Sequence, residues 1–201
     1  MEKIMDLLKG SLKEEAKTLT WISKNLDDSY INAIEIIRKT TGKVIVSGVG
    51  KSGIIGKKIA STLSSLGTPS FFMHSDEALH GDLGMVTSHD IAIFLSNSGE
   101  TEEILKTLPS LKKIGTPIIS ITGNKDSSLA KQSDITLIYK VEKETDHLNL
   151  SPTSSAMAML AIGDALAVTL SYLKGFSSKD FLLFHPEGSL AQKVLKNDQE
   201  V

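Results

Sequence analysis

The segment VIVSGVGKSG, which covers residues 44–53, decides the fold class of this chain. Its first three residues are β-branched and predict a short buried strand. The glycines after them lead into a segment from Ser52 to Leu66 whose apolar residues have helical spacing, and Gly67 is suited to end that helix. A buried strand, a glycine-rich turn and a helix in this order are typical of one unit of a parallel α/β sheet.

The same alternation continues along the chain. An amphipathic helix is predicted from Thr101 to Ile114, between two further strands. Most strand segments are apolar throughout, which is typical of strands covered on both faces. We therefore predict a doubly wound α/β fold, in which a five-stranded parallel sheet is sandwiched between helices. The strands predicted after the first are Ser70–Met73, Ile91–Leu95, Pro117–Ile121 and Ile135–Tyr139.

The segments on either side of the sheet are also assigned from their patterns. Apolar residues at helical spacing predict two helices within residues 1–41, and the α/β core is expected over residues 42–190. A long apolar helix is predicted from Ser154 to Lys174, and Asp164 at its centre favours burial against protein over a position in lipid. Residues 191–201 form a polar tail. We expect the 201 residues to form a single domain.

Composition excludes several classes of function. The formal net charge is -2, so no overall positive field would hold a nucleic acid. The absence of cysteine excludes disulfides, thiolate metal sites and a cysteine nucleophile. Charged residues interrupt residues 1–20, and no uncharged segment is long enough to span a bilayer. We expect a cytoplasmic protein that has neither a nucleic-acid nor a membrane partner.

The glycine-rich loop fits the pattern G-x-G-x-x-G from Gly48 to Gly53, so a dinucleotide site must be considered. Such a site needs an acidic residue at the end of the second strand. That strand instead ends near His74, and Asp76 is an imperfect substitute. A phosphate-binding P-loop fails more clearly, because its first glycine would fall at Ile45. Neither nucleotide motif fits.

A second loop, Ser96-Asn97-Ser98-Gly99-Glu100-Thr101, lies between the third strand and its helix. Its three hydroxyls, beside N–H groups at a helix N-terminus, would form a receptor for one phosphate dianion. An ordinary helix cap by Ser98 or Thr101 is the simpler alternative. The first loop adds Lys51 and Ser52 at the same edge of the sheet, because the carboxyl ends of parallel strands share an edge. The pair of loops favours phosphate binding.

These loops resemble those of the sugar isomerase domain family, which binds phosphosugars. The resemblance implies reversible aldose–ketose conversion between D-arabinose 5-phosphate and D-ribulose 5-phosphate, a step that supplies 3-deoxy-D-manno-octulosonate for surface polysaccharide. Members often carry a C-terminal pair of cystathionine-β-synthase domains, which we expect this chain to lack as a short form. The matching segments are Gly48–Gly53, Gly67–Pro69, Glu77–Gly84, Ser96–Thr101, Leu148–Ser155, Gly163–Val168 and His185-Pro186.

The resemblance also implies which residues act. Glu144 is the preferred group for proton transfer, because it follows the fifth strand in a loop with no evident structural need for an acid. Which glutamate is the base stays open. The catalytic roles fall on Lys51, Glu103, Glu144 and His185. The residues expected to bind substrate are Ser52, Gly67, Thr68, His80, Ser96, Ser98 and Thr101.

Assembly and metal dependence follow from the same resemblance. His185 is expected to complete the site of a neighbouring subunit in a homotetramer. We expect that no cofactor is required, and that His74 binds at most an adventitious or inhibitory divalent ion. Two other functions stay open, namely a non-catalytic phosphosugar-sensing domain and an isomerase of another phosphosugar.

Overall fold

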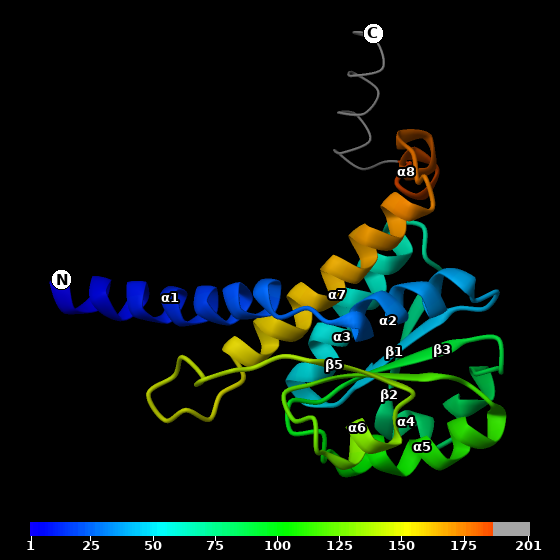
Figure 1. Ribbon diagram of the computed structural model, residues 1–201, viewed down its shortest axis with the longest axis horizontal. Helices are drawn as coiled ribbons and strands as arrows, with labels where there is room; N and C mark the ends of the chain where they lie inside the picture. The colour runs from blue at the N-terminus through cyan, green and yellow to red at the C-terminus, as the bar shows by residue number, and fades with distance from the viewer. Residues whose placement is uncertain (187–201) are drawn as a thin grey trace, which may run out of the picture.

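The computed structural model describes residues 1–186 and has three layers, with a sheet between two layers of helices (Figure 1). The five strands are all parallel and lie in the order β2-β1-β3-β4-β5. This arrangement confirms the predicted doubly wound α/β fold. The strands are β1 (Val44–Gly48), β2 (Ser70–His74), β3 (Ile91–Leu95), β4 (Ile118–Thr122) and β5 (Ile135–Ile138).

Helices lie before, between and after the strands. The predicted helices correspond to α1 (Glu2–Lys24), α2 (Asp28–Lys39), α3 (Gly50–Ser65), α5 (Glu102–Ile114) and α7 (Ser154–Leu173). The sequence patterns did not predict the shorter helical elements, because one or two turns are too short to show a period. These are α4 (Ser75–Ala78), the 3-10 turn η1 (Asp82–Met85), α6 (Ser128–Gln132) and α8 (Ser178–Phe184).

The predicted strand ends differ slightly from the observed ones. β4 begins at Ile118 rather than Pro117, because proline has no N–H to donate to a neighbouring strand. β2 extends by one residue to His74, and Tyr139 lies just beyond β5. These shifts leave every strand with the same direction and place all the carboxyl ends at one edge of the sheet.

Alternate positions of the strands face opposite helical layers. Val44 and Val46 of β1 belong to the core cluster that includes residues of α2, α3 and α7. Ile45 belongs to a second cluster on the other face, with residues of α4, α5 and α6. β1, β3 and β4 are buried at every position, which explains why their sequences are apolar throughout rather than at alternate residues.

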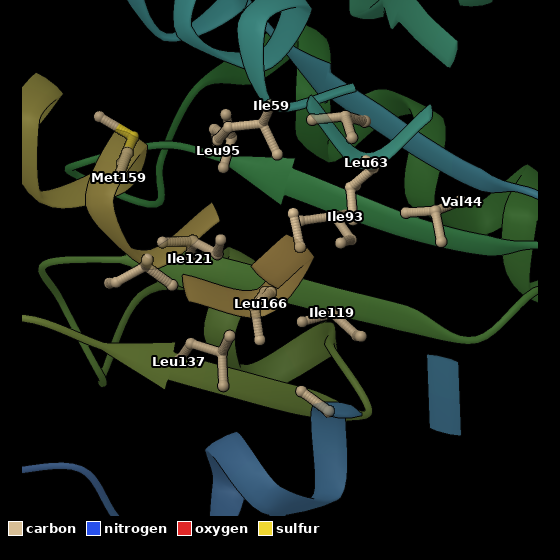
Figure 2. Packing of buried hydrophobic residues seen from close by; sticks show 14 of the residues in the cluster. Val44, Ile59, Leu63, Ile93, Leu95, Ile119, Ile121, Leu137, Met159 and Leu166 are labelled. Carbon is tan, nitrogen blue, oxygen red and sulfur yellow. The ribbon is translucent and has the colours of Figure 1, made fainter. Parts of the chain in front are cut away.

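Figure 2 shows how α3 and α7 cover the first face of the sheet. Ile59 and Leu63 of α3 and Leu166 of α7 belong to one cluster with Ile93 and Ile121 of the sheet. Complete burial of such a side chain contributes about 1.5–3 kcal/mol to the free energy of unfolding. This cluster therefore fixes α3, whose N-terminus lies at the carboxyl edge of the sheet.

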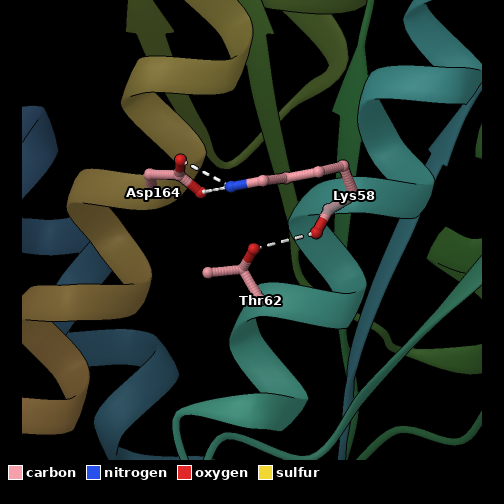
Figure 3. Close-up of polar contacts among 3 residues, drawn as sticks. All are labelled: Lys58, Thr62 and Asp164. Carbon is pink, nitrogen blue, oxygen red and sulfur yellow. Dashed lines mark hydrogen bonds and ion pairs between the residues drawn. The ribbon is translucent and has the colours of Figure 1, made fainter. Parts of the chain in front are cut away.

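Gly163 lets α7 approach α3 closely. A Cβ atom at this position would lie 2.4 Å from Cγ1 of Ile59, so a larger residue would push the helices apart. At the next residue, Asp164 accepts hydrogen bonds from the ammonium of Lys58 on α3, with 2.6 Å between Nζ and Oδ2 (Figure 3). The small residue and the ion pair together set where α7 crosses α3.

By length and hydropathy alone, α7 could cross a membrane, and it is the one helix of residues 1–186 that could do so. Its buried residues, among them Met159, Ile162 and Leu170, belong to the core cluster formed with α3 and the sheet. Within the described residues α7 is therefore packed against protein, as the sequence predicted.

α1 extends beyond the body of the domain (Figure 1). Its buried residues are Thr18 and Ile22, near its C-terminal end, whereas residues 1–10 are all exposed. α1 and α2 are the two helices predicted within residues 1–41. The predicted polar tail, residues 191–201, lies outside the described residues.

Candidate active site

The loop between β1 and α3 is shaped by its glycines. Gly50 has a φ of 57°, a left-handed conformation that favours glycine, and it is the first residue of α3. A Cβ atom on Gly53 would lie 2.9 Å from the carbonyl oxygen of Gly48, so glycine allows α3 to begin close against β1. Lys51, which is exposed, and Ser52, which is half-buried, lie in the first turn of this helix.

The serine loop, residues 96–101, follows the neighbouring strand β3 and is held by its own hydrogen bonds. The hydroxyls of Ser96 and Thr101 lie 2.8 Å apart, and Oγ of Ser96 accepts a hydrogen bond of 3.0 Å from the N–H of Gly99. Oγ of Ser98 accepts a hydrogen bond of 3.2 Å from the N–H of Glu100. Ser96 is buried and supports the loop, whereas Ser98 is exposed at the surface.

Within the described part of the chain, neither α3 nor α5 carries a side-chain cap. Val49 and Thr101 occupy the N-cap positions, and neither side chain accepts a hydrogen bond from the first turn of its helix. The alternative that Ser98 or Thr101 is an ordinary helix cap is therefore wrong, since Ser98 bonds to Glu100, which precedes α5. Two helix N-termini with their positive dipole ends thus meet at one edge of the sheet, which is an arrangement that binds anions.

A cleft of about 280 Å³ separates the serine loop from the loop after β5. On one side of it, Asn97 is held by its neighbours: its Oδ1 accepts a hydrogen bond of 2.9 Å from the hydroxyl of Tyr139, and its carbonyl oxygen accepts one from the N–H of Gly123. Sequence reasoning missed both Asn97 and Tyr139 as parts of the site, because their contact joins two strands. The lining residues are Asn97, Gly123, Val141, Glu142, Lys143, Glu144 and Asn149.

Glu144 lies on the other side of this cleft and is bonded to the N-terminus of α7. Its Oε2 accepts hydrogen bonds of 2.8 and 2.9 Å from the N–H and hydroxyl of Thr153, and one of 3.2 Å from the N–H of Ser155. The expectation that this loop has no structural need for an acid is therefore wrong. Among residues 1–186, Oε1 has no hydrogen-bond partner.

The same contacts decide the charge of Glu144. Partial burial acts to raise the pKa of this carboxyl, but the polar groups of Ser155 and Thr153 outweigh it and hold the pKa below its usual range. Glu144 is thus ionised at neutral pH, with one oxygen anchored and the other available.

Glu103, the second predicted carboxylate, lies in the first turn of α5, directly after the serine loop. It is half-buried, and its carboxylate has no hydrogen-bond or ion-pair partner among the residues that the structure describes. Glu103 and Lys51 therefore lie in the first turns of the two uncapped helices, on neighbouring strands.

His74 and His80 follow β2, at the same edge of the sheet. Nδ1 of His74 accepts a hydrogen bond of 3.3 Å from the N–H of Asp76 and so caps α4. His80 is exposed. No group of three side chains that could hold a metal ion occurs within residues 1–186, and binding of a divalent ion by His74 stays a prediction.

His185 lies far from this edge of its own chain. Its Nε2 is 2.9 Å from Oγ of Ser65, at the C-terminal end of α3, and its ring stacks on Phe181 with 4.0 Å between centroids. α3 spans 16 residues, and a helix of that length is about 24 Å long. Lys51 and His185 are thus at opposite ends of α3, and one chain does not bring them together.

Gly67 and Thr68 lie at the same distant end as His185. Gly67, with a φ of 85°, follows α3 and ends it as predicted. Thr68 is buried, and its hydroxyl accepts a hydrogen bond of 2.9 Å from Lys174. Within one chain, these two residues are therefore apart from the serine loop, and their contact with substrate stays a prediction. No sequence motif pointed to Lys174.

A family model for the SIS domain, the sugar isomerase domain, matches residues 36–169. The chain belongs to the SIS domain family. The matched region includes both uncapped helices, the serine loop and Glu144. The resemblance inferred from the loops is confirmed.

Several relatives of this SIS domain carry a common name. The probable arabinose 5-phosphate isomerase of Haemophilus influenzae is 46% identical over 191 residues, which cover 95% of this chain and 57% of the relative. Arabinose 5-phosphate isomerase KdsD of Escherichia coli K12 is 48% identical over 187 residues, 93% of this chain and 57% of the relative. This chain thus spans just over half the length of these two proteins.

A solved structure supports the same placement. The structure of E. coli CFT073 c3406 in complex with arabinose 5-phosphate is 46% identical, with a TM-score of 0.89 over 92% of this chain and 98% of that one. A sugar-phosphate isomerase structure from Listeria monocytogenes, 33% identical, also has a TM-score of 0.89 and covers 92% of this chain and 98% of that one.

Proposed function

We propose that this chain catalyses the reversible isomerisation of D-arabinose 5-phosphate and D-ribulose 5-phosphate, and so supplies the synthesis of 3-deoxy-D-manno-octulosonate in the cytoplasm. The observation that carries the proposal is the meeting of two uncapped helices, α3 and α5, beside a cleft lined by an ionised glutamate. The names of the relatives that are nearly half identical to this chain, and of the structure in complex with arabinose 5-phosphate, support the choice of substrate.

The phosphate of the sugar would bind at the serine loop. The hydroxyls of Ser98 and Thr101 and the first N–H groups of α5 would donate to its oxygens, and the dipole of α5 would favour its negative charge. Lys51 and Ser52, in the first turn of α3, would add a cation and a donor from the neighbouring strand. Binding at this fixed point would place the other end of the sugar in the cleft.

Proton transfer would then use Glu144. In the forward direction its free Oε1 would remove the proton from C2 of the open-chain aldose, and the electron pair would form an enediolate with C1. Returning the proton to C1, while the C2 hydroxyl loses its proton, gives the ketose. The three hydrogen bonds on Oε2 keep the carboxylate ionised and fix its orientation. Glu103 is the alternative base, and Lys51 would stabilise the enediolate charge.

This chemistry moves only protons, and we propose that it requires no cofactor. A divalent ion at His74 would act as an inhibitor rather than as part of the reaction. Proton NMR in deuterium oxide with EDTA present tests the reaction directly, with D-arabinose 5-phosphate as substrate. We expect D-ribulose 5-phosphate to appear and C2 of the aldose to acquire deuterium. Binding without turnover would instead favour a sensor or an isomerase of another phosphosugar.

We propose further that His185 and Thr68 serve the site of a neighbouring subunit in a homotetramer, since they lie at the other end of α3 from Lys51. Complementation tests this arrangement. Lys51→Ala and His185→Ala should each be inactive alone, and refolding the two variants together should restore activity in mixed assemblies. A mixture that stays inactive would show that each chain uses its own His185.

A further inference from the structure

The N-terminal part of α1 carries an apolar stripe that none of the described residues of its own chain covers. Ile4, Leu8 and Leu12 follow one another at intervals of four residues and are 63%, 57% and 67% exposed. On a helix these three positions share a face with Leu19 and Ile22, the residues by which α1 packs on the core. The core-facing side of α1 therefore continues well past the end of the domain.

A matching groove lies between α1, α2 and α7. Its volume is about 750 Å³. Along α7, its floor is formed by Ala161, Ala165 and Thr169, small residues spaced one turn apart, which leave room for a helix to approach. The walls include Leu26 and Ile31, which are 57% and 62% exposed.

The stripe cannot fill the groove of its own chain. Residues 2–24 form one continuous helix. With a rise of about 1.5 Å per residue, Leu8 is about 21 Å along the axis from Ile22, which lines the groove. A second chain has no such restriction.

The charges of the two surfaces have opposite sign. Residues 1–13 hold three lysines and two acidic residues. The groove is bordered by Asp27, Asp28 and Glu35, and within residues 1–186 no basic residue lines it. Opposite charges around an apolar contact favour one pairing of surfaces over others.

We propose that two copies of this chain associate by exchange of α1, with residues 4–12 of each copy lying in the α1–α2–α7 groove of the other. Because each copy provides both surfaces, one two-fold axis satisfies both contacts and closes the assembly. The contact does not depend on isomerase activity, so its test is separate from that of the proposed function.

The first test is the mass of the protein in solution, measured by light scattering over a range of concentrations. The double variant Leu8→Gln/Leu12→Gln should have half the mass of the wild-type assembly or less. The matched control is Glu2→Gln/Asp6→Asn, which changes two exposed residues on the opposite face of the same turns and should keep the wild-type mass. A monomeric wild type, an unchanged mass of the leucine variant, or equal losses in both variants would overturn the proposal.

The second test exploits the absence of cysteine from the chain. Leu8→Cys protein mixed with Ala165→Cys protein should form a disulfide-linked pair under mild oxidation. Asp6→Cys, on the other face of α1, should pair with Ala165→Cys at most a tenth as efficiently. Circular dichroism would show that the variants keep their helices, since all three positions are exposed. Equal pairing by Leu8→Cys and Asp6→Cys would contradict the assigned face.

Discussion

The hydroxyl of Tyr139 donates a hydrogen bond of 2.9 Å to Oδ1 of Asn97 and so orients the Asn97 amide at the edge of the cleft. With Oδ1 engaged, the two N–H groups of the amide are left as donors. A Cβ atom at Gly123 would lie 2.7 Å from the same oxygen, so the glycine is what lets the amide sit there. Tyr139 itself is buried and makes its contact across two strands.

The variant Tyr139→Phe tests whether this orientation matters for the substrate. We expect KM for D-arabinose 5-phosphate to rise about threefold to tenfold with little change in kcat, since one hydrogen bond contributes about 0.5–1.5 kcal/mol. The control is Tyr30→Phe, which removes a comparable hydrogen bond of 2.9 Å, to the carbonyl oxygen of Ile138, away from Asn97. Equal KM changes in the two variants would contradict a positioning role.

Glu144→Gln should lower kcat by about 10²–10⁴, the usual contribution of a general base. The amide keeps the shape of the side chain and can still accept from Thr153, so the fold should persist. Glu103→Gln, measured alongside, distinguishes the two candidate bases. The variant with the larger loss of kcat, and with loss of deuterium exchange at C2, identifies the base; near-normal rates in both variants would refute the isomerase mechanism.

Glu144 should also make stability depend on pH. Its pKa is lower in the folded chain than in the unfolded one, where it is about 4.3. The unfolded state therefore binds the proton more readily, so the contribution of Glu144 to stability is complete above about pH 5 and is lost as the pH falls through the folded pKa. The difference in Tm between wild type and Glu144→Gln should shrink on acidification. Glu142→Gln, at an exposed neighbouring position, should show no such trend.

Two helical glycines should respond to alanine in opposite ways. Gly163→Ala would place a methyl group against Ile59 and should lower the free energy of unfolding by about 1–3 kcal/mol. Gly10→Ala, on exposed α1, meets no atom of the described residues within 4 Å and should raise it by up to about 1 kcal/mol, because alanine favours the helix. Urea denaturation measures both. A neutral Gly163→Ala would mean that α7 can shift away from α3 at no cost.

The ion pair between Lys58 and Asp164 is expected to contribute little despite its short distances. The side chains are 48% and 38% exposed, so water and salt weaken their attraction, and such pairs contribute about 0.2–1 kcal/mol. A double-mutant cycle with Lys58→Met and Asp164→Asn should give a coupling in that range, smaller in high salt. A coupling several times larger would show that the pair is effectively buried.

The sequence was informative wherever a local pattern determined the structure. The apolar runs identified the sheet, and the two loops identified the anion site, because strand order in a parallel sheet places their ends together. The role of Glu144 at α7 escaped prediction because its partners Thr153 and Ser155 lie 9 and 11 residues further along a loop. The position of His185 beside Ser65 was equally hidden, since it depends on how α8 folds back on the end of α3.

α3 joins the two groups of predicted functional residues, with Lys51 in its first turn and Ser65, the partner of His185, as its last residue. Its interior is packed under α7 and cannot bulge without disturbing the core. Inserting one residue would turn one end relative to the other by about 100° and move it by about 1.5 Å. The number of residues in α3 is therefore constrained separately from their identity, and we expect length variation among related chains to be confined to the loops.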